Sequence, residues 1–133
     1  MKDIVGTWRL VKTLARNDAG EPMHPPYGPE PMGVTVFSAD RRMIAVLCDS
    51  RPALPDGETE REYNSYCGTY TFDGTTLVTR VDACSDPARM GSAQVRKVRF
   101  QGERMILQPP PGELGGVKVM RELTWEKISA VSL

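Results

Sequence analysis

Short runs of β-type sequence, separated by turn signals, constrain the fold of this chain more than any other feature. Asp73-Gly74 and Gln101-Gly102 each stand between two runs in which apolar and polar residues alternate, which is the pattern of a β-hairpin. Helical periodicity is almost absent, except for a short segment from Asp56 to about Tyr63, where Asp56 can cap a helix. The sequence therefore predicts an all-β fold with one short helix.

Eight strands are expected. They cover Gly6–Arg16, Val34–Ser38, Met43–Cys48, Tyr66–Phe72, Leu77–Cys84, Gln94–Phe100, Met105–Gln108 and Val117–Lys127. Most neighbours are joined by short turns, so they pair antiparallel, and closing them into a barrel removes the exposed edges. A two-sheet sandwich usually needs longer crossover connections. We therefore favour an eight-stranded antiparallel up-and-down barrel, with the five-proline stretch from Asn17 to Met32 forming a stiff flap.

Composition limits the class of protein further. The 133 residues fit one domain, residues 1–133, and they carry 17 basic and 17 acidic side chains. Zero net charge argues against nucleic acid and anionic membranes as partners, and no apolar run is long enough to span a membrane. The start of the chain shows no signal-peptide pattern, and three cysteines at irregular spacing are expected to be reduced. These features predict a cytoplasmic location.

Alternation across each hairpin predicts which side chains point into the barrel. The inward set is Thr35, Phe37, Met43, Ala45, Leu47, Tyr66, Gly68, Tyr70, Phe72, Leu77, Thr79, Val81, Ala83, Gln94, Arg96, Val98, Phe100, Met105, Leu107, Arg121, Leu123 and Trp125. Arg80 and Asp82 then face outward. A register error of one residue would instead put these two inside as an ion pair, and the sequence leaves that alternative open.

An apolar interior with a few polar groups is what a small-molecule site requires. Arg96 is the most informative of these groups, because a buried guanidinium needs a carboxylate, a phenol or a bound anion. The alternative is that Arg96 pairs with a neighbouring carboxylate or reaches the barrel rim. Tyr66, Tyr70 and Arg96 are the candidate catalytic residues, although both tyrosines also fit as core aromatics. The expected ligand-binding set is Phe37, Met43, Leu47, Tyr66, Tyr70, Thr79, Gln94, Arg96 and Arg121.

No motif in the chain points to a cofactor or a metal. There is no Gly-rich phosphate loop and no dinucleotide fingerprint. His24 is the only imidazole, which makes a protein zinc site unfavourable, and its place among prolines suggests a solvated side chain or part of a lid. Glu58, Glu60 and Glu62 are expected to form the solvated face of the short helix. We therefore expect no cofactor and no metal.

Five blocks, in order along nearly the whole chain, carry a family resemblance: Gly6–Val11, Pro26–Gly33, Tyr63–Tyr70, Gln94–Arg96 and Leu123–Glu126. The chain resembles the bacterial lipocalin-like domain family. The resemblance implies an eight-stranded barrel with a central cavity. Some small lipocalin-like barrels bind apolar metabolites, and others catalyse cofactor-free cyclisation, isomerisation or lyase reactions.

The chain departs from the family pattern in two places. Thr79-Arg80-Val81-Asp82 replaces a His-His-Val-Glu stretch of that family, and Asp86–Met90 replaces an aromatic Pro-Asn-Trp loop. The first change puts imidazole chemistry in doubt and leaves open a substrate with a carboxylate or enolate facing Arg80 or Arg96.

Three functional hypotheses follow. The first is a barrel that binds a small, largely apolar metabolite, with an anionic group on that metabolite as an open possibility. The second is a cofactor-free isomerase, cyclase or lyase that acts on such a metabolite in the same cavity. The third is an interaction module whose barrel is solid. A small molecule is the expected partner in the first two, and a homodimer is compatible with all three.

Overall fold

The computed structural model describes residues 3–129 as nine strands and one short 3₁₀ turn. The elements are β1 (Gly6–Asn17), β2 (Pro31–Phe37), β3 (Arg42–Asp49), β4 (Tyr63–Phe72), β5 (Thr76–Cys84), η1 (Pro87–Arg89), β6 (Ala93–Gln101), β7 (Arg104–Gln108), β8 (Gly112–Leu114) and β9 (Val117–Ser129). Each strand from β1 to β6 pairs with the next strand along the chain, and all pairings are antiparallel.

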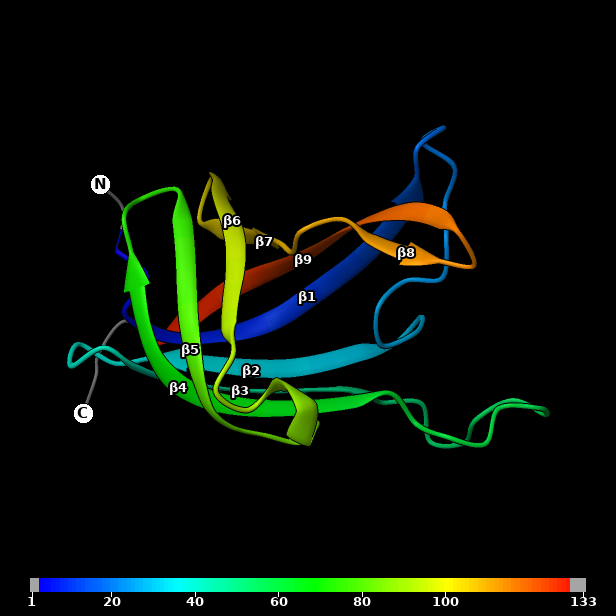
Figure 1. Cartoon of the computed structure of the whole chain (residues 1–133), viewed down its shortest axis with the longest axis horizontal. Helices are drawn as coiled ribbons and strands as arrows, with labels where there is room; N and C mark the ends of the chain where they lie inside the picture. The colour runs from blue at the N-terminus through cyan, green and yellow to red at the C-terminus, as the bar shows by residue number, and fades with distance from the viewer. Residues whose placement is uncertain (1–2, 130–133) are drawn as a thin grey trace.

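The barrel is closed by its first and last strands. β9 pairs with β7 on one edge and with β1 on the other, so β1 to β7 and β9 form a closed ring of eight strands. The expected eight-stranded antiparallel barrel is therefore confirmed. The additional strand β8 pairs with the first residues of β9. It follows the Pro109–Pro111 break and extends one edge of the barrel at the end where the β1–β2 and β3–β4 loops lie (Figure 1).

The helix expected from Asp56 to Tyr63 is wrong, since this segment forms turns and leads directly into β4. Gly57 has φ 91°, which a right-handed helix excludes, and a segment this short cannot nucleate a helix without an apolar face to bury. Arg61 holds the loop instead, because its Nη1 donates to the carbonyl oxygens of Asp49 and Arg51. The only helical turn among the described residues is η1, and none of their helices has the length and apolar character needed to cross a membrane.

The strand register resolves which residues face inward on β5. Thr79 and Val81 are each 1 % exposed, whereas Arg80 and Asp82 lie on the surface. The alternative register with Arg80 and Asp82 inside is therefore wrong, and Asp82 pairs outside the barrel with Arg42 at 2.6 Å. Ala83, expected inside, is exposed because Asp82 is an extra residue in a β-bulge opposite Cys67 and Gly68.

A second bulge changes the phase of β1. Leu10 pairs with Trp125 but Lys12 pairs with Thr124, which leaves one extra residue on β1. Strict alternation from Trp8 and Leu10 would turn Lys12 and Leu14 inward, whereas with the extra residue Lys12 is exposed and Ala15, opposite the inward-facing Arg121, is buried. The bulge explains why a lysine interrupts the apolar pattern of this strand.

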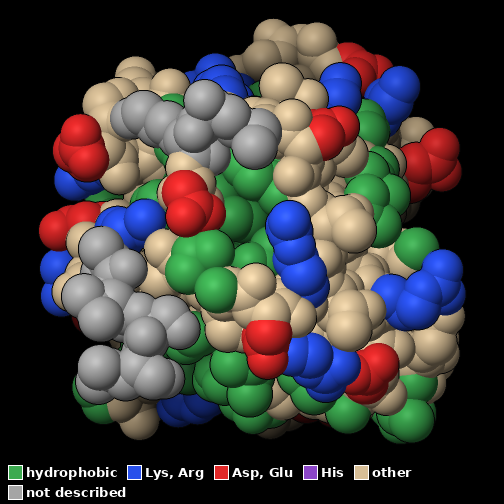
Figure 2. Space-filling model, turned by 90° about the vertical axis from the view of Figure 1, so that its left-hand side faces the viewer, with side chains coloured by type: hydrophobic (Ala, Val, Ile, Leu, Met, Phe, Trp, Pro, Cys, Tyr) green, Lys and Arg blue, Asp and Glu red, His purple; other side chains and the backbone are tan. Residues whose placement is uncertain are grey.

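The apolar core fills the end of the barrel near the β2–β3 and β4–β5 turns. Phe37 is 1 % exposed and its ring meets that of Tyr70 edge-on, with centroids 5.2 Å apart. Trp8 also belongs to this core, and its indole N–H donates to the carbonyl oxygen of Ile4 at 2.9 Å. Figure 2 views the molecule from this end and shows basic and acidic side chains intermixed around hydrophobic ones. The described side chains visible on this face therefore form no continuous patch of one charge.

Candidate functional site

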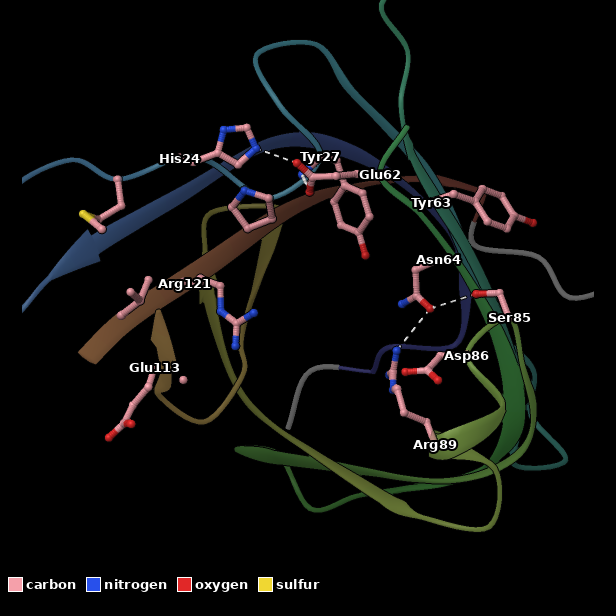
Figure 3. A pocket seen from close by; sticks show the side chains of 14 residues that line it. His24, Tyr27, Glu62, Tyr63, Asn64, Ser85, Asp86, Arg89, Glu113 and Arg121 are labelled. Atoms are coloured by element: carbon pink, nitrogen blue, oxygen red, sulfur yellow. Dashed lines mark hydrogen bonds and ion pairs between the residues drawn. The ribbon is translucent and has the colours of Figure 1, made fainter. Parts of the chain in front are cut away.

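Two adjoining cavities occupy the other end of the barrel. The outer chamber, of about 640 Å³, lies under the β1–β2 loop and beside η1 (Figure 3). The inner chamber, of about 500 Å³, reaches down to Trp125. Five residues line both chambers and so mark their boundary: Pro26, Tyr27, Asn64, Arg89 and Arg121. A small molecule that enters through the outer chamber must pass these side chains.

Three guanidinium groups converge on this boundary and on the inner chamber. We call Arg89, from η1, Arg96, from β6, and Arg121, from β9, the arginine cluster. Arg89 Nη1 donates to Asn64 Oδ1 at 3.1 Å, and its Nη2 donates to Gln94 Oε1. Arg89 and Arg121 extend toward the middle of the cavity in Figure 3. The side-chain hydrogen-bond acceptors of Arg89 are therefore neutral amide oxygens, which do not balance its positive charge.

Arg96 and Arg121 are poorly satisfied. Arg96 Nη1 donates to the adjacent carbonyl oxygen of Val95 at 2.9 Å, and the buried Nε of Arg121 has no partner. Among residues 3–129, no ion pair includes a member of the arginine cluster. The expected alternative, in which Arg96 pairs with a neighbouring carboxylate, is therefore not what the structure shows.

Burial and like charge act together on Arg96. Loss of water around the guanidinium lowers its pKa below the usual value, and the charges of Arg89 and Arg121 lower that pKa further. Tyr66 and Tyr27 act in the opposite direction. An arginine keeps its proton even so, because its ordinary pKa lies far above neutral pH. The inner chamber therefore carries concentrated positive charge without an acidic counterpart.

Glu62 fastens the flap over the outer chamber. One of its carboxylate oxygens is hydrogen-bonded to His24 Nε2, and the other accepts from the backbone N–H of Tyr27 at 2.8 Å. The expectation that Glu62 lies on a solvated helix face is thus wrong. Tyr27 has φ 65°, and its ring points from the flap into the cavity (Figure 3). Burial is the main reason that the pKa of the Tyr27 phenol lies above its ordinary value.

Five of the expected ligand-binding residues line the inner chamber: Leu47, Tyr66, Gln94, Arg96 and Arg121. The other four, Phe37, Met43, Tyr70 and Thr79, are buried and line neither chamber. Tyr70 shows why. It lies four residues beyond Tyr66 on β4, about 13 Å further along the strand, and its hydroxyl donates to the carbonyl oxygen of Ser38 at 2.7 Å. Tyr70 is thus a core residue, and its role as a candidate catalyst is not supported by its position.

Sequence reasoning missed three polar residues that line both chambers: Tyr27, Asn64 and Arg89. Asn64 could have been found, because the inward pattern of Tyr66 and Tyr70 extends back to it once β4 is known to begin at Tyr63. Arg89 had a weaker signal in the preceding Asp86-Pro87, where Asp86 caps η1 by accepting from the N–H of Ala88 at 3.1 Å. Tyr27 lies in an irregular loop and has no periodic signal.

No three His, Cys, Asp or Glu side chains of residues 3–129 are grouped in a way that would hold a metal ion. Cys48, Cys67 and Cys84 are free thiols, each partly exposed. The chemistry available in the inner chamber is accordingly that of guanidinium, phenol and amide groups beside apolar side chains, whereas His24, Glu62, Asp86 and Glu113 line the outer chamber.

The comparisons with known proteins agree with this geometry. No curated protein and no solved structure matches the chain. A protein family described as the lipocalin-like domain does match, over residues 5–128, which include all nine strands except the last residue of β9. A closed eight-stranded barrel with a cavity at one end is the architecture that this description names. The chain therefore belongs to the lipocalin-like domain family.

Proposed function

We propose that this protein binds a small, largely apolar molecule that carries one anionic group. A single observation carries the proposal: three arginines face one cavity, and no acidic side chain forms an ion pair with any of them among the described residues. Concentrating positive charge away from water is unfavourable unless an opposite charge is bound. A carboxylate, or another anion of that size, would supply it.

The walls of the inner chamber support an apolar body for this ligand. Leu47, Leu107, Leu123 and Trp125 line this chamber together with the arginine cluster and offer contact surface without further charge. An apolar cavity with a few polar groups that orient the ligand is the usual composition of a small-molecule site. The anionic group would lie at the boundary between the chambers, and the apolar part would extend toward Trp125.

Native mass spectrometry of the freshly purified protein, followed by denaturing extraction, is the first test. We expect one small acid per chain. Calorimetry on the emptied protein then separates charge from apolar contact, with decanoate and methyl decanoate as probes that differ only in the anionic group. Decanoate should bind at least about tenfold more tightly, as expected for a charge-assisted hydrogen bond. Equal affinity for the acid and its ester would contradict the proposal.

A cofactor-free isomerase, cyclase or lyase is a second candidate, and the position of two phenols favours it. Tyr27 and Tyr66 line the same chamber as Arg96. A phenol is protonated at neutral pH, and burial raises the pKa of Tyr27 further, so Tyr27 can donate a hydrogen bond to a substrate oxygen and pass its proton on only where that oxygen gains negative charge. Arg96 would stabilise negative charge that develops on a substrate oxygen in such a step.

Incubating the protein with the extracted molecule, and following its mass and its retention time, tests this candidate. We expect conversion to an isomer or a cleaved product in the unmodified protein, and about a hundredfold slower conversion in the double variant Tyr27→Phe, Tyr66→Phe. Unchanged conversion by that variant would exclude both phenols from the reaction.

A further inference from the structure

Two buried nitrogen donors in the inner chamber have no acceptor. They are Arg121 Nε and Trp125 Nε1, and both belong to residues that line this chamber. Trp8 provides the comparison within the same protein. Trp8 and Trp125 are equally buried, each 2 % exposed, but the indole N–H of Trp8 has the carbonyl oxygen of Ile4 as its acceptor. A buried donor without a partner destabilises a folded protein, so the exception at Trp125 needs an explanation.

The two donors are arranged along one wall. Arg121 and Trp125 are four residues apart on β9, so both side chains point inward and their Cα atoms lie about 13 Å apart along the strand. Leu123 lies between them and faces the same chamber. Along this wall, from the mouth of the chamber toward its floor, a hydrogen-bond donor (Arg121) is followed by an apolar side chain (Leu123) and then by a second donor (Trp125).

The surroundings of Trp125 determine which group would complement its N–H. Its cross-strand neighbours are Leu10 on β1 and Met105 on β7, and neither side chain has an oxygen. A ligand hydroxyl placed there would satisfy the indole but would bring a donor of its own. A carbonyl oxygen only accepts hydrogen bonds, so it satisfies Trp125 without creating a new unpaired group.

We infer that the ligand is an oxo acid, a molecule with an anionic group at the arginine cluster and a carbonyl oxygen near its far end, bound to Trp125 Nε1. This inference rests on the proposed binding function and specifies its ligand class. Trp125 is a specificity-determining residue in this arrangement, because it favours an oxo acid over the acid that lacks the carbonyl. Arg121 positions the anionic group at the other end.

Calorimetry with three probes of similar length tests the inference: decanoate, 9-oxodecanoate and methyl decanoate. We expect 9-oxodecanoate to bind about fivefold to tenfold more tightly than decanoate, which corresponds to one buried hydrogen bond gained. In the NMR spectrum, the indole N–H resonance of Trp125 should shift further with the oxo acid than with decanoate. The resonance of Trp8 should remain in place with both, because its hydrogen bond is already made.

Two variants complete the test. Trp125→Phe should abolish the preference for 9-oxodecanoate over decanoate, because the ratio of the two affinities cancels any change in apolar contact, whereas Trp8→Phe should retain that preference. If decanoate binds better than its ester but 9-oxodecanoate has no advantage, the oxo-acid inference is wrong and the proposed function stands. If the acids bind no better than the ester, the proposed function itself fails and the inference falls with it. A preference that survives Trp125→Phe would show that another group recognises the carbonyl.

Discussion

Arg96 is a single residue whose charge is expected to favour ligand binding and to lower the stability of the folded chain. Its side chain turns inward from β6 and lies near two other guanidinium groups, without a carboxylate partner. Mutual repulsion and loss of water both raise the free energy of the folded chain. Such an arrangement is typical of sites that keep a charge for a ligand rather than for the fold.

Replacing Arg96 with methionine should therefore separate the two effects. We expect Arg96→Met to raise the free energy of unfolding by about 1 kcal/mol and to weaken decanoate binding about tenfold or more. Arg99→Met is the matched control, because Arg99 lies on the outer face of the same strand and pairs with Glu122 at 2.7 Å. Urea unfolding and calorimetry measure the two quantities. A stability loss in Arg96→Met would show that this arginine supports the fold.

Asp49 leads to a prediction about pH. Hydrogen bonds from the side chain of Arg51 hold the pKa of this buried carboxyl below its ordinary value of 3.8. The ion pair thus stabilises the folded chain fully above that value, and its contribution is lost as the pH falls through the lowered folded-state pKa. Asp49→Asn should be less stable than the natural chain near pH 7, and the gap should narrow below about pH 3. Thermal unfolding across this range measures it, and a gap that is independent of pH would contradict the assignment.

The sequence could predict which side chains face the interior only for residues on regular strands. Arg96 and Gln94 could be assigned to the interior because alternation on β6 is unbroken from Ala93 to Gln101. Arg89 and Tyr27 lie on irregular backbone, where no period relates a side chain to a face. Their contribution to the cavity depends on how η1 and the flap fold back over the barrel, which is a tertiary property.

At the scale of elements, β-bulges explain the errors within strands. The extra residue on β5 moves Ala83 outward, and the extra residue on β1 leaves Lys12 exposed and buries Ala15. Strict alternation assumes one residue per step on both partners, and a bulge breaks that assumption without leaving a strong mark in the sequence. For the bulge on β5, the glycine opposite it on β4, Gly68, is the sequence feature that indicates an irregularity.

Gly68 should be intolerant of any side chain. A Cβ at this position would lie 2.0 Å from the carbonyl oxygen of Arg80, and backbone cannot move aside as a flexible side chain can. We expect Gly68→Ala to lower the free energy of unfolding by more than about 3 kcal/mol. Gly20→Ala is the control, because it has φ +80° but open space around it, and should cost only about 1 kcal/mol. Chemical unfolding of both variants decides the matter, and equal losses would mean that the bulge relaxes.

The cap of η1 should affect binding through Arg89. Asp86 accepts from the N–H of Ala88 and so begins the turn that carries Arg89 to the cavity. Asp86→Asn removes the charge and keeps the cap, whereas Asp86→Ala removes both. We expect the alanine variant to bind decanoate about threefold more weakly than the asparagine variant. Calorimetry compares them directly. Equal affinities would show that Arg89 is positioned without the cap.

At the scale of the whole molecule, the barrel has a packed end and a hollow end. Alternation correctly placed Phe37, Tyr70, Tyr66 and Arg96 on the inner side of the wall, and it did not show that the first two lie in the core and the last two at the cavity. Depth along the barrel axis depends on the tilt and stagger of all the strands together. The sequence therefore predicted the fold better than it predicted the site.

The two ends should respond differently to loss of volume. Phe37→Ala, in the packed end, should lower the free energy of unfolding by about 3–5 kcal/mol and leave decanoate affinity within about twofold. Leu123→Ala, in the hollow end, should cost less than about 2 kcal/mol, because it enlarges an existing cavity, and should weaken decanoate binding severalfold. Unfolding and binding measured on both variants test this division. A shared pattern would mean that the cavity and the core are one unit.

The pairing of β1 with β9 has a consequence for how the protein is made. The ring closes through ten residue pairs between strands near opposite ends of the chain. During synthesis, β1 leaves the ribosome long before β9 exists, so its edge waits unpaired while the intervening strands emerge. Completion of the barrel therefore waits until β9 has emerged, and it depends on contacts between residues far apart in sequence; topologies of this kind fold slowly. A nascent chain stalled before Val117 should be protease-sensitive, and it should become resistant only after Ser129 has cleared the exit tunnel.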